Sequence, residues 1–294
     1  MFEIYYYLRM TFDPDFFRQL ANNSHQHSRD EKYFNDKEKS LLSDIEMLHG
    51  PHVTSELSFG EIGVINFPFF DMGEITSKKL FGLDEMILFS FYFVNKKRYK
   101  NTLDLGANIG LHTLVMKKLG FHVTSYEPDF IHFNQMKEVM KLNNVTEEGL
   151  IPRAISDKKG EMDYIRVLGN TTGSHLLGSK ENVYGPTDVV NVEVDDFLEV
   201  LKTNDFDFVK MDVEGHEAIL LNQITINSIK KTDIMLEIGS EKNSRVIFEI
   251  LKQKEIPAYA QKINWRRVVT LDDIPSHHTH GSLFLSVQGA PNWH

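Results

Sequence analysis

Acidic residues and glycines follow two apolar segments of the sequence. Asp104, Gly106 and Gly110 lie in LDLGANIG, and Glu127 lies in SYEPD further along the chain. An apolar segment that ends in glycine is typical of a strand that turns tightly into a helix, and in an open α/β sheet this turn borders the ligand crevice. We therefore expect a ligand at residues 104–110, with Glu127 accepting hydrogen bonds from its ribose hydroxyls.

The turn lacks two common phosphate-binding patterns. The dinucleotide pattern G-x-G-x-x-G needs glycine at positions that hold Asn108 and Leu111 here, and GLHT does not provide the Gly-Lys-Ser/Thr of a P-loop. NAD and nucleoside triphosphates are therefore disfavoured. S-adenosylmethionine fits better, because it carries an adenosine without a pyrophosphate and its net positive charge suits a carboxylate at the turn.

A second acidic group occurs in VKMDVEGHE. Asp212, Glu214 and His216 would meet at the carboxyl edge of the sheet, because a glycine after the strand lets the chain bend. Any of them could accept a proton from an alcohol during methyl transfer. We favour His216 or Glu214, because histidine titrates near neutral pH and burial can raise the pKa of a glutamate toward it. The alternatives are that Glu214 caps the following helix and organises the loop, and that His216 is a surface histidine; Glu237 in IMLEIG is a further candidate, either as base or as a loop-ordering carboxylate.

Other polar clusters do not predict a metal. The histidines of SHHTHGS lack the spacing of a helical zinc motif and have no acidic residue beside them, so we predict a loop. The paired acids of VDDFL and DFDFVKMD are explained as well by strand edges and helix N-caps as by a divalent cation. The Gly/Ser/Thr-rich loop at 170–174 is expected to be either a lid over the site or a mobile surface connection.

Alternating strand-like and helix-like segments surround these motifs. They run from residue 101 to 157 and again from 206 to 255, which predicts right-handed βαβ units in a parallel sheet with helices on both faces. The predicted fold class is therefore α/β, doubly wound and Rossmann-like. Residues 149–157 are predicted as one strand of that sheet, EMDYIRV and VVNVEVDDFLEVL as strands outside the alternation, and 257–263 and 281–288 as strands that close the sheet.

The first 80 residues are predicted to form an extension to a domain that spans residues 81–294. Their first fifty look helical, with Asp13 as a helix N-cap and a second helix that ends at Gly50 and Pro51. The second helix has an apolar stripe that we expect to pack on the main domain, formed by Leu41, Leu42, Ile45 and Leu48. Residues 56–70 predict a β-hairpin, and 82–96 a helix.

Composition is that of a soluble globular protein. The 294 residues are 41% hydrophobic and 25% charged, and they include no cysteine, so disulfides, thiolate metal sites and a catalytic cysteine are excluded. The formal net charge of -10 disfavours nucleic acid and anionic membranes as partners. Since no secretory signal or long apolar span is evident, we expect a cytoplasmic protein. The sequence carries no signal for an oligomeric state.

The motifs also resemble those of a known family. LDLGANIGLHTL, SYEPD, AISDKKG, VEVDDFL and DFVKMDVEGHEAIL, in this order and spacing, are similar to the FkbM family of class I S-adenosylmethionine-dependent methyltransferases, over about residues 81–287. The resemblance implies a seven-stranded sheet with an antiparallel last strand. It also implies methyl transfer to oxygen, often a hydroxyl of a sugar or natural product.

The resemblance implies roles for individual residues. The methionine part of the cofactor would be cradled by Asp104, Gly106, Ala107, Asn108 and Gly110. Glu127 would hold the ribose, Ile155 and Ser156 would flank the adenine, and Asp157 could reach its amino group. Asp212 would approach the methionine end or the transferring methyl group, and Glu85 in GLDEM resembles an acidic residue that precedes the first strand in the family.

Together these observations predict an S-adenosylmethionine-dependent O-methyltransferase that acts on a hydroxyl of a sugar, glycan or small metabolite. Methylation at a carboxyl or nitrogen is the alternative chemistry, since it needs the same cofactor half and a different acceptor pocket. A non-catalytic binding module of the same fold is the contrasting class. The joint presence of DLGANIG, Glu127 and DVEGHE disfavours that module.

Overall fold

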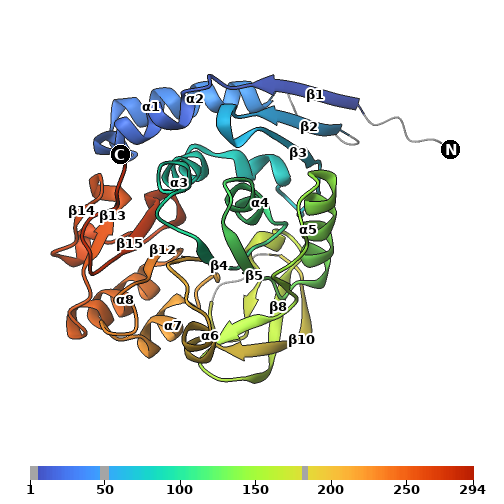
Figure 1. The fold of residues 1–294 in the computed structure, drawn as a ribbon. Helices are drawn as coiled ribbons and strands as arrows, with labels where there is room; N and C mark the ends of the chain where they lie inside the picture. Colours follow the sequence, from blue (N-terminus) through green and yellow to red (C-terminus); the bar gives the residue numbers. More distant parts are fainter. Residues whose placement is uncertain (1–5, 47–52, 181–184) are drawn as a thin grey trace.

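The computed structural model describes residues 6–46, 53–180 and 185–294, and a large twisted sheet lies at its centre (Figure 1). The strand order of this sheet is β14-β13-β15-β12-β11-β4-β5-β6. Its parallel strands are β4 (Asn101–Leu105), β5 (His122–Tyr126), β6 (Leu150–Ile151), β11 (Phe208–Met211) and β12 (Asp233–Glu237). The other three strands, β13 (Ala258–Ala260), β14 (Arg266–Arg267) and β15 (Ser282–Leu285), are joined by antiparallel pairing, and β15 runs antiparallel to both of its neighbours, β12 and β13. The antiparallel last strand is confirmed, and the short β14 makes eight strands where seven were expected.

Helices cover both faces of this sheet, as Figure 1 shows. One face carries α3 (Leu83–Val94), α4 (Leu111–Lys118) and α5 (Phe130–Leu142), and the other carries α6 (Phe197–Thr203), α7 (Glu217–Gln223) and α8 (Glu241–Gln253). Each face has its own apolar core. Side-chain caps fix the starts of α5, α6 and α8 through Asp129, Asp196 and Ser240. The predicted doubly wound α/β class is confirmed.

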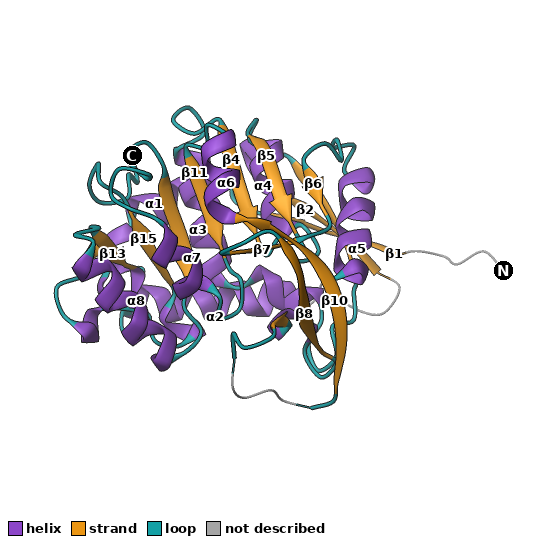
Figure 2. Cartoon of the chain, turned by 90° about the horizontal axis from the view of Figure 1, so that it is seen from below, coloured by secondary structure: helices purple, strands orange, loops and turns teal. Residues whose placement is uncertain are grey.

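A second sheet of four strands lies outside this alternation, in the order β7-β10-β8-β9. It consists of β7 (Ala154–Ser156), β8 (Gly160–Val167), β9 (His175–Leu176) and β10 (Thr187–Asp196), and Figure 2 shows the long β8–β10 ribbon reaching away from the main sheet. The prediction of one strand over 149–157 is wrong, because the chain leaves the main sheet after β6 and joins β10 as β7. Pro152 stands at the break, where it has no N–H to donate to a ladder.

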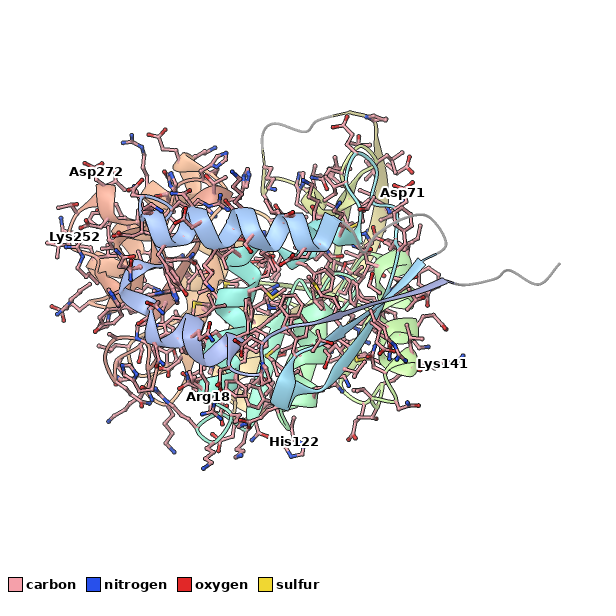
Figure 3. The ribbon with its side chains drawn as sticks, turned by 90° about the horizontal axis from the view of Figure 1, so that it is seen from above. Arg18, Asp71, His122, Lys141, Lys252 and Asp272 are labelled. Carbon is pink, nitrogen blue, oxygen red and sulfur yellow. The ribbon has the colours of Figure 1, made fainter. Side chains whose placement is uncertain are left out.

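The N-terminal segment forms a layer across the α3–α5 face, seen from above in Figure 3. It contains β1 (Tyr6–Thr11), α1 (Phe16–Asn22), α2 (Lys32–Glu46), β2 (Val53–Ser58) and β3 (Val64–Pro68). The β2–β3 hairpin and the helix at 82–96 are confirmed. The purely helical start is wrong, because β1 pairs in parallel with β2, and Asp15, not Asp13, occupies the N-cap of α1.

The apolar stripe of α2 is only partly buried. Leu41 and Ile45 are buried in the core shared with α3, whereas Leu42 is 44% exposed. Leu48, Gly50 and Pro51, which the sequence placed at the end of this helix, lie outside the described residues. No helix in the described ranges is long and apolar enough to cross a membrane.

Short 3₁₀ helices connect the larger elements. They are η1 (Ser24–Gln26), η2 (Gly60–Ile62), η3 (Ser77–Phe81), η4 (Thr171–Gly173), η5 (Gln261–Ile263), η6 (Leu271–Asp273) and η7 (His278–His280). Three of these, η3, η4 and η7, contribute residues to the cavity described next. The second sheet and the N-terminal layer therefore add loops to the carboxyl edge of the main sheet.

Candidate functional site

A cavity of about 1010 Å³ opens at the carboxyl ends of β4, β5, β11 and β12. We call the strand ends and the turns that follow them, together with Glu85 of α3, the floor; Glu127, Asp212 and Glu237 also belong to it. We call the lining residues from segments 75–80, 170–180, 240–246 and 277–278 the rim. The cavity lies where an open α/β sheet binds its ligands, at the switch point between the neighbouring parallel strands β4 and β11, where the strand order reverses.

The glycine turn after β4 forms the centre of the floor. Gly106 has a left-handed φ of +72°, and a Cβ atom placed there would lie 1.8 Å from the backbone oxygen of Asp212. Only glycine therefore lets the β4 turn rest on the end of β11. Gly110 is also left-handed, and a Cβ there would lie 2.5 Å from the side chain of Met136 on α5. Gly106 and Asn108 line the cavity, whereas Gly110 faces α5.

Glu127 is bound directly to this turn. Its Oε2 accepts a hydrogen bond from the backbone N–H of Asn108 at 2.7 Å, and its Oε1 accepts one from the N–H of Asp129 at 2.8 Å. The side chain lines the cavity although the residue is only 4% exposed. Burial raises the pKa of Glu127 to about 8, against the opposing effect of the two N–H donors. The glycine turn and Glu127, which the sequence analysis placed at one ligand site, are therefore in direct contact.

Other predicted cofactor residues lie behind the floor. Asp104 is fully buried, accepts a hydrogen bond from the Thr113 hydroxyl at 2.6 Å and lies 3.7 Å from the Lys210 ammonium group. Asp104, Ala107, Gly110 and Ser156 are described residues that are not part of the cavity lining. The expectation that the Asp104 carboxylate faces the ligand is therefore wrong for this structure, in which it supports the turn from below.

Lys210 ties the floor together, and the sequence interpretation missed it. Its ammonium group donates to the backbone oxygen of Gly106 at 3.2 Å and lies 3.5 Å from an Asp212 oxygen. Burial acts to lower the pKa of this lysine, but the charges of Asp212, Asp104 and Glu85 outweigh it and raise the pKa. A lysine inside the apolar strand DFVKMD was the available signal, since a buried lysine needs acidic partners.

The loop after β11 is organised by Glu217. Its carboxylate accepts hydrogen bonds from the N–H groups of Val213 and Gly215 and from the side-chain amide of Asn243. Burial raises the pKa of Glu217 to about 7, in spite of these donors. The loop-ordering role that the sequence offered for Glu214 therefore belongs to Glu217.

Glu214 is free of that structural task and lines the cavity. It forms an ion pair with Lys180 of the rim. Burial raises its pKa, the Lys180 charge lowers it, and the nearby Asp212 raises it again, with a net increase. Glu237 also lines the cavity, and its pKa is raised well above the ordinary value by burial and by the charges of Asp212, Glu85 and Glu214.

His216 is held between two hydroxyl groups. Its Nε2 lies 2.8 Å from the Ser156 hydroxyl oxygen and its Nδ1 lies 2.9 Å from that of Ser179. The residue is 2% exposed, and burial lowers its pKa to about 4. The expected surface position and the expected titration near neutral pH are therefore both wrong. A neutral ring with both nitrogens engaged joins β7 to the rim and is a poor proton acceptor.

The two residues expected to flank the adenine have different surroundings. Ile155 of β7 lines the cavity, whereas the Ser156 hydroxyl lies 2.8 Å from His216 Nε2. Asp157 is exposed and accepts a hydrogen bond from Ser156 at 3.2 Å. The reason is the break after β6, which places residues 154–156 in the second sheet.

The loop at 170–174 is fixed over the cavity by hydrogen bonds. The N–H of Thr171 donates to the Met72 oxygen at 2.9 Å, the N–H of Glu74 donates to the Gly169 oxygen at 2.7 Å, and the Thr171 hydroxyl lies 2.8 Å from the His132 ring. Of the two expectations for this loop, the mobile connection is not supported. The N-terminal layer and the second sheet share this part of the rim.

The histidine-rich loop also reaches the rim. His277 and His278 line the cavity, and their rings lie 3.9 Å apart, while His280 accepts from the N–H of Ser276. The sequence interpretation set this loop aside, because nothing in SHHTHGS shows which cavity it borders. Among the described residues no group of three or more histidine, aspartate or glutamate side chains is arranged to hold a metal ion.

The floor as a whole suits a cation. Glu85, Glu127, Asp212, Glu214 and Glu237 line the cavity. Lys180 pairs with Glu214, and Lys210 lies beside Asp212. Burial raises the pKa of Glu127 and of Glu237, and for Glu237 the charges of Asp212, Glu85 and Glu214 raise it further. A positively charged ligand would compensate the remaining negative charge of the floor, whereas a phosphate would add to it.

A family model matches part of this chain, and some solved structures are distantly similar to it. Residues 104–263 match the family model of the methyltransferase FkbM domain. Similar solved structures include the S-adenosylmethionine-dependent methyltransferase from Agrobacterium tumefaciens (11% identity, 81% of this chain and 70% of that chain covered, TM-score 0.40). Another is the methyltransferase domain of METTL16 (14% identity, 67% of this chain covered, TM-score 0.37), of which the match spans only 63%. A search of curated proteins found no match.

The family match extends from the end of β4 through α8 to the segment after β13, and so contains the glycine turn, Glu127 and the loop after β11. It covers more than half of the chain. The cofactor of such enzymes is S-adenosylmethionine, which agrees with the excess of carboxylates on the floor. The chain belongs to the FkbM family of S-adenosylmethionine-dependent methyltransferases.

Proposed function

We propose that this methyltransferase transfers the methyl group to a hydroxyl oxygen of a glycan or small metabolite. The observation that carries the proposal is the division of one cavity into an acidic floor and a rim rich in hydrogen-bonding side chains. The floor matches a cationic cofactor, and the rim matches an acceptor with several hydroxyl groups. S-adenosylmethionine supplies a methyl group that is already activated by its sulfonium, so the protein mainly has to position the acceptor.

The floor residues would hold the cofactor in a definite order along the sheet. Glu127, at the end of β5, would accept hydrogen bonds from the ribose hydroxyls with the lone pairs that the two N–H donors leave free. Gly106, Asn108 and Asp212, at the ends of β4 and β11, would face the methionine part. Ile155 would border the adenine. Asp104, Ala107, Gly110 and Ser156 would support these residues from behind.

The acceptor hydroxyl must lose its proton when its oxygen bonds to the methyl carbon. We assign Glu214 as the base, because it lines the cavity, has no loop-ordering task and has a pKa raised by burial. The ion pair with Lys180 keeps part of its negative charge. Asp212 would then orient the cofactor, and His216 would hold the loop in place.

The rim supports a polyhydroxylated acceptor. Its lining includes the side chains of Asn170, Thr172, Ser240 and Asn243, which together offer donors and acceptors for sugar hydroxyls. Ile75, Lys79 and Leu80 of the N-terminal segment complete this side. We propose that residues 1–80 are an extension that shapes the acceptor site of the domain at 81–294.

A methyl-transfer screen tests this function. The full-length protein is incubated with cell extract and S-adenosylmethionine carrying a labelled methyl group, and labelled products are identified by mass spectrometry. We expect a methyl ether that is stable to mild base, and no labelling with Glu127→Gln. A base-labile methyl ester or an N-methyl product would contradict O-methylation, and unchanged labelling with the variant would contradict the cofactor site.

A further inference from the structure

Three polar side chains form a chain of hydrogen bonds between α3 and α4, which lie side by side in Figure 1. The Tyr92 hydroxyl lies 2.9 Å from His112 Nδ1, and His112 Nε2 lies 2.6 Å from an oxygen of Glu85. Glu85 and Tyr92 are seven residues apart on α3, so they share one face of that helix. His112 stands in the first turn of α4, directly after the glycine turn of the floor. The chain therefore runs from the core to the cavity.

The hydrogen bond between His112 and Glu85 has a fixed direction. Tyr92 is fully buried, and burial together with the charges of Asp104 and Glu85 raises its pKa well above 10, so its hydroxyl keeps its hydrogen. Against a neutral histidine ring, Tyr92 donates to Nδ1 and the ring hydrogen is on Nε2. Against a charged ring both nitrogens carry hydrogen. In each case Nε2 donates to the Glu85 carboxylate, which can only accept, and Tyr92 supports this arrangement by donating to Nδ1 of the neutral ring or accepting from Nδ1 of the charged ring.

Glu85 is the end of the chain that reaches the ligand. Its side chain is 29% exposed and lines the main cavity. Burial alone would raise the pKa of Glu85, but the charge and hydrogen bond of His112 and the charge of Lys210 outweigh it and lower the pKa. Glu127, Glu214 and Glu237, which share the cavity, have raised pKa values. Glu85 is therefore a floor carboxylate with a dedicated partner for its negative charge.

The position of Glu85 selects one part of the cofactor. A small cavity of about 10 Å³ next to the main one is lined by Glu85, Lys210, Asp212, Glu237 and Ser282, which places Glu85 at the β11–β12 end of the floor. Glu127 stands at the β5 side of the floor. If Glu127 holds the ribose, the β11–β12 end faces the amino-acid part of the cofactor, which carries an ammonium group.

We propose that His112, oriented by Tyr92, is a positioning residue that aims the Glu85 carboxylate at the ammonium group of the cofactor's amino-acid part. This inference rests on the proposed function, because it takes the floor as the cofactor site. A contact that only joined α3 to α4 would stabilise the fold and would not distinguish between parts of the cofactor. The two roles therefore differ in what they predict for ligands that lack the amino-acid part.

Calorimetric titration of the full-length protein separates the two roles. The probes are S-adenosylhomocysteine and 5′-methylthioadenosine, which has the same adenosine and thioether but no amino-acid part. For Glu85→Gln we expect the Kd of S-adenosylhomocysteine to rise about 10- to 100-fold, the loss of one hydrogen bond to a charged group, while that of methylthioadenosine changes less than about twofold. Glu138→Gln on the exposed side of α5 is the matched control and should change neither Kd.

The partner residues give a graded series. His112→Phe keeps the ring contacts with Phe89 and Tyr92 but removes the donor, and it should weaken S-adenosylhomocysteine about tenfold. His112→Gln restores an N–H donor and should recover most of that loss. Tyr92→Phe should weaken binding about threefold, and it remains available as a test if His112→Phe does not fold.

Three outcomes would overturn the proposal. Equal weakening of both probes by Glu85→Gln or His112→Phe would mean a structural role only. Unchanged affinity for S-adenosylhomocysteine in these variants would mean that Glu85 does not face the amino-acid part, while the cofactor site itself stands. A wild-type protein that binds neither probe would end the proposed function and this inference together, and that result is distinct from the other two.

Discussion

The floor and the rim of the cavity come from different kinds of structural element. The floor consists of the ends of four neighbouring strands and Glu85 of α3, and its other carboxylates come from the regular alternation of strand and helix. The rim consists of segments 75–80, 170–180, 240–246 and 277–278, three of which lie outside the parallel strands and the helices that follow them. The floor therefore has a geometry set by the sheet, whereas the rim depends on how loops of this chain meet. In the proposed function the floor binds the cofactor and the rim selects the acceptor.

The largest expected effect tests whether the floor is a closely packed unit. Gly106→Ala should lower the free energy of unfolding by more than about 4 kcal/mol, because the new Cβ would overlap the Asp212 backbone oxygen and the φ is left-handed. Gly120→Ala is the matched control, since Gly120 has a φ of +89° and open space around its Cβ position. It should cost about 1 to 2 kcal/mol. Urea unfolding measures both, and equal losses would refute the close contact.

The next largest effect is on cofactor affinity, which a floor variant should lower more than a rim variant. Glu127→Gln should raise the Kd of S-adenosylhomocysteine about 10- to 100-fold, because the amide has one oxygen where the carboxyl group has two and can no longer accept from the N–H groups of both Asn108 and Asp129. Thr172→Ala, in the rim, should leave this Kd within about twofold. Calorimetry measures both, and a larger loss in Thr172→Ala than in Glu127→Gln would reverse the assignment of the two regions.

His216 connects Ser156 of β7 to Ser179 of the rim. Its substitution should lower the stability of the protein without changing the pH dependence of methyl transfer. His216→Ala removes the partner of the Ser156 and Ser179 hydroxyls, so it should lower the free energy of unfolding by about 1–3 kcal/mol. The apparent pKa values in the pH dependence of methyl transfer should stay the same. Loss of a titration near neutral pH in this variant would return His216 to the role of base.

The smallest expected effect is a pH dependence that belongs to the floor. The pKa values of Glu127 and Glu217 are raised to about 8 and about 7 from an ordinary value of 4.5, so the folded protein holds protons that the unfolded chain releases. Their contribution to the free energy of unfolding should therefore fall as pH rises from about 4.5 to about 8 and level off above the folded pKa of Glu127. His27, His132 and His216 have pKa values lowered from 6.5 to about 4, so they contribute in the opposite direction below about pH 6.5.

Urea midpoints measured between pH 6.5 and 8.5 provide the check. Glu127→Gln should flatten the decrease, since it removes the group with the highest of these values, and Thr172→Ala should keep the wild-type slope. A steeper slope in Glu127→Gln would mean that the burial of this carboxyl is not the cause.

The sequence predicted much of the floor, for a physical reason. Parallel strands end at one edge, so Glu127 and Asp212 could be placed together from their positions after apolar segments. The same rule misplaced the Asp104 side chain, because it predicts at which edge of the sheet a residue lies but not the direction in which its side chain points. It also missed Lys210, whose role depends on three partners from different strands and turns.

The rim could not be predicted, because its contacts join segments far apart in the chain. His216 looked like an exposed histidine until Ser156 and Ser179 enclosed it, and its pKa changed as a result. The break at Pro152 places Ile155 and Ser156 in the second sheet, and the sequence pattern did not predict this sheet. Local patterns carry information on strands and turns, whereas burial by remote loops is a property of the folded chain.

The aromatic layer at the amino-terminal end has one further consequence. Phe17, Phe34 and Phe67 belong to the same apolar cluster as Phe91 and Phe93 of α3, and the rings of Phe17 and Phe93 lie 6.2 Å apart. A shortened chain beginning at residue 81 would expose the apolar surface around Phe91 and Phe93 to water and would tend to aggregate. We therefore expect residues 1–80 and the domain at 81–294 to unfold as one cooperative unit, and the full-length protein is the form to study.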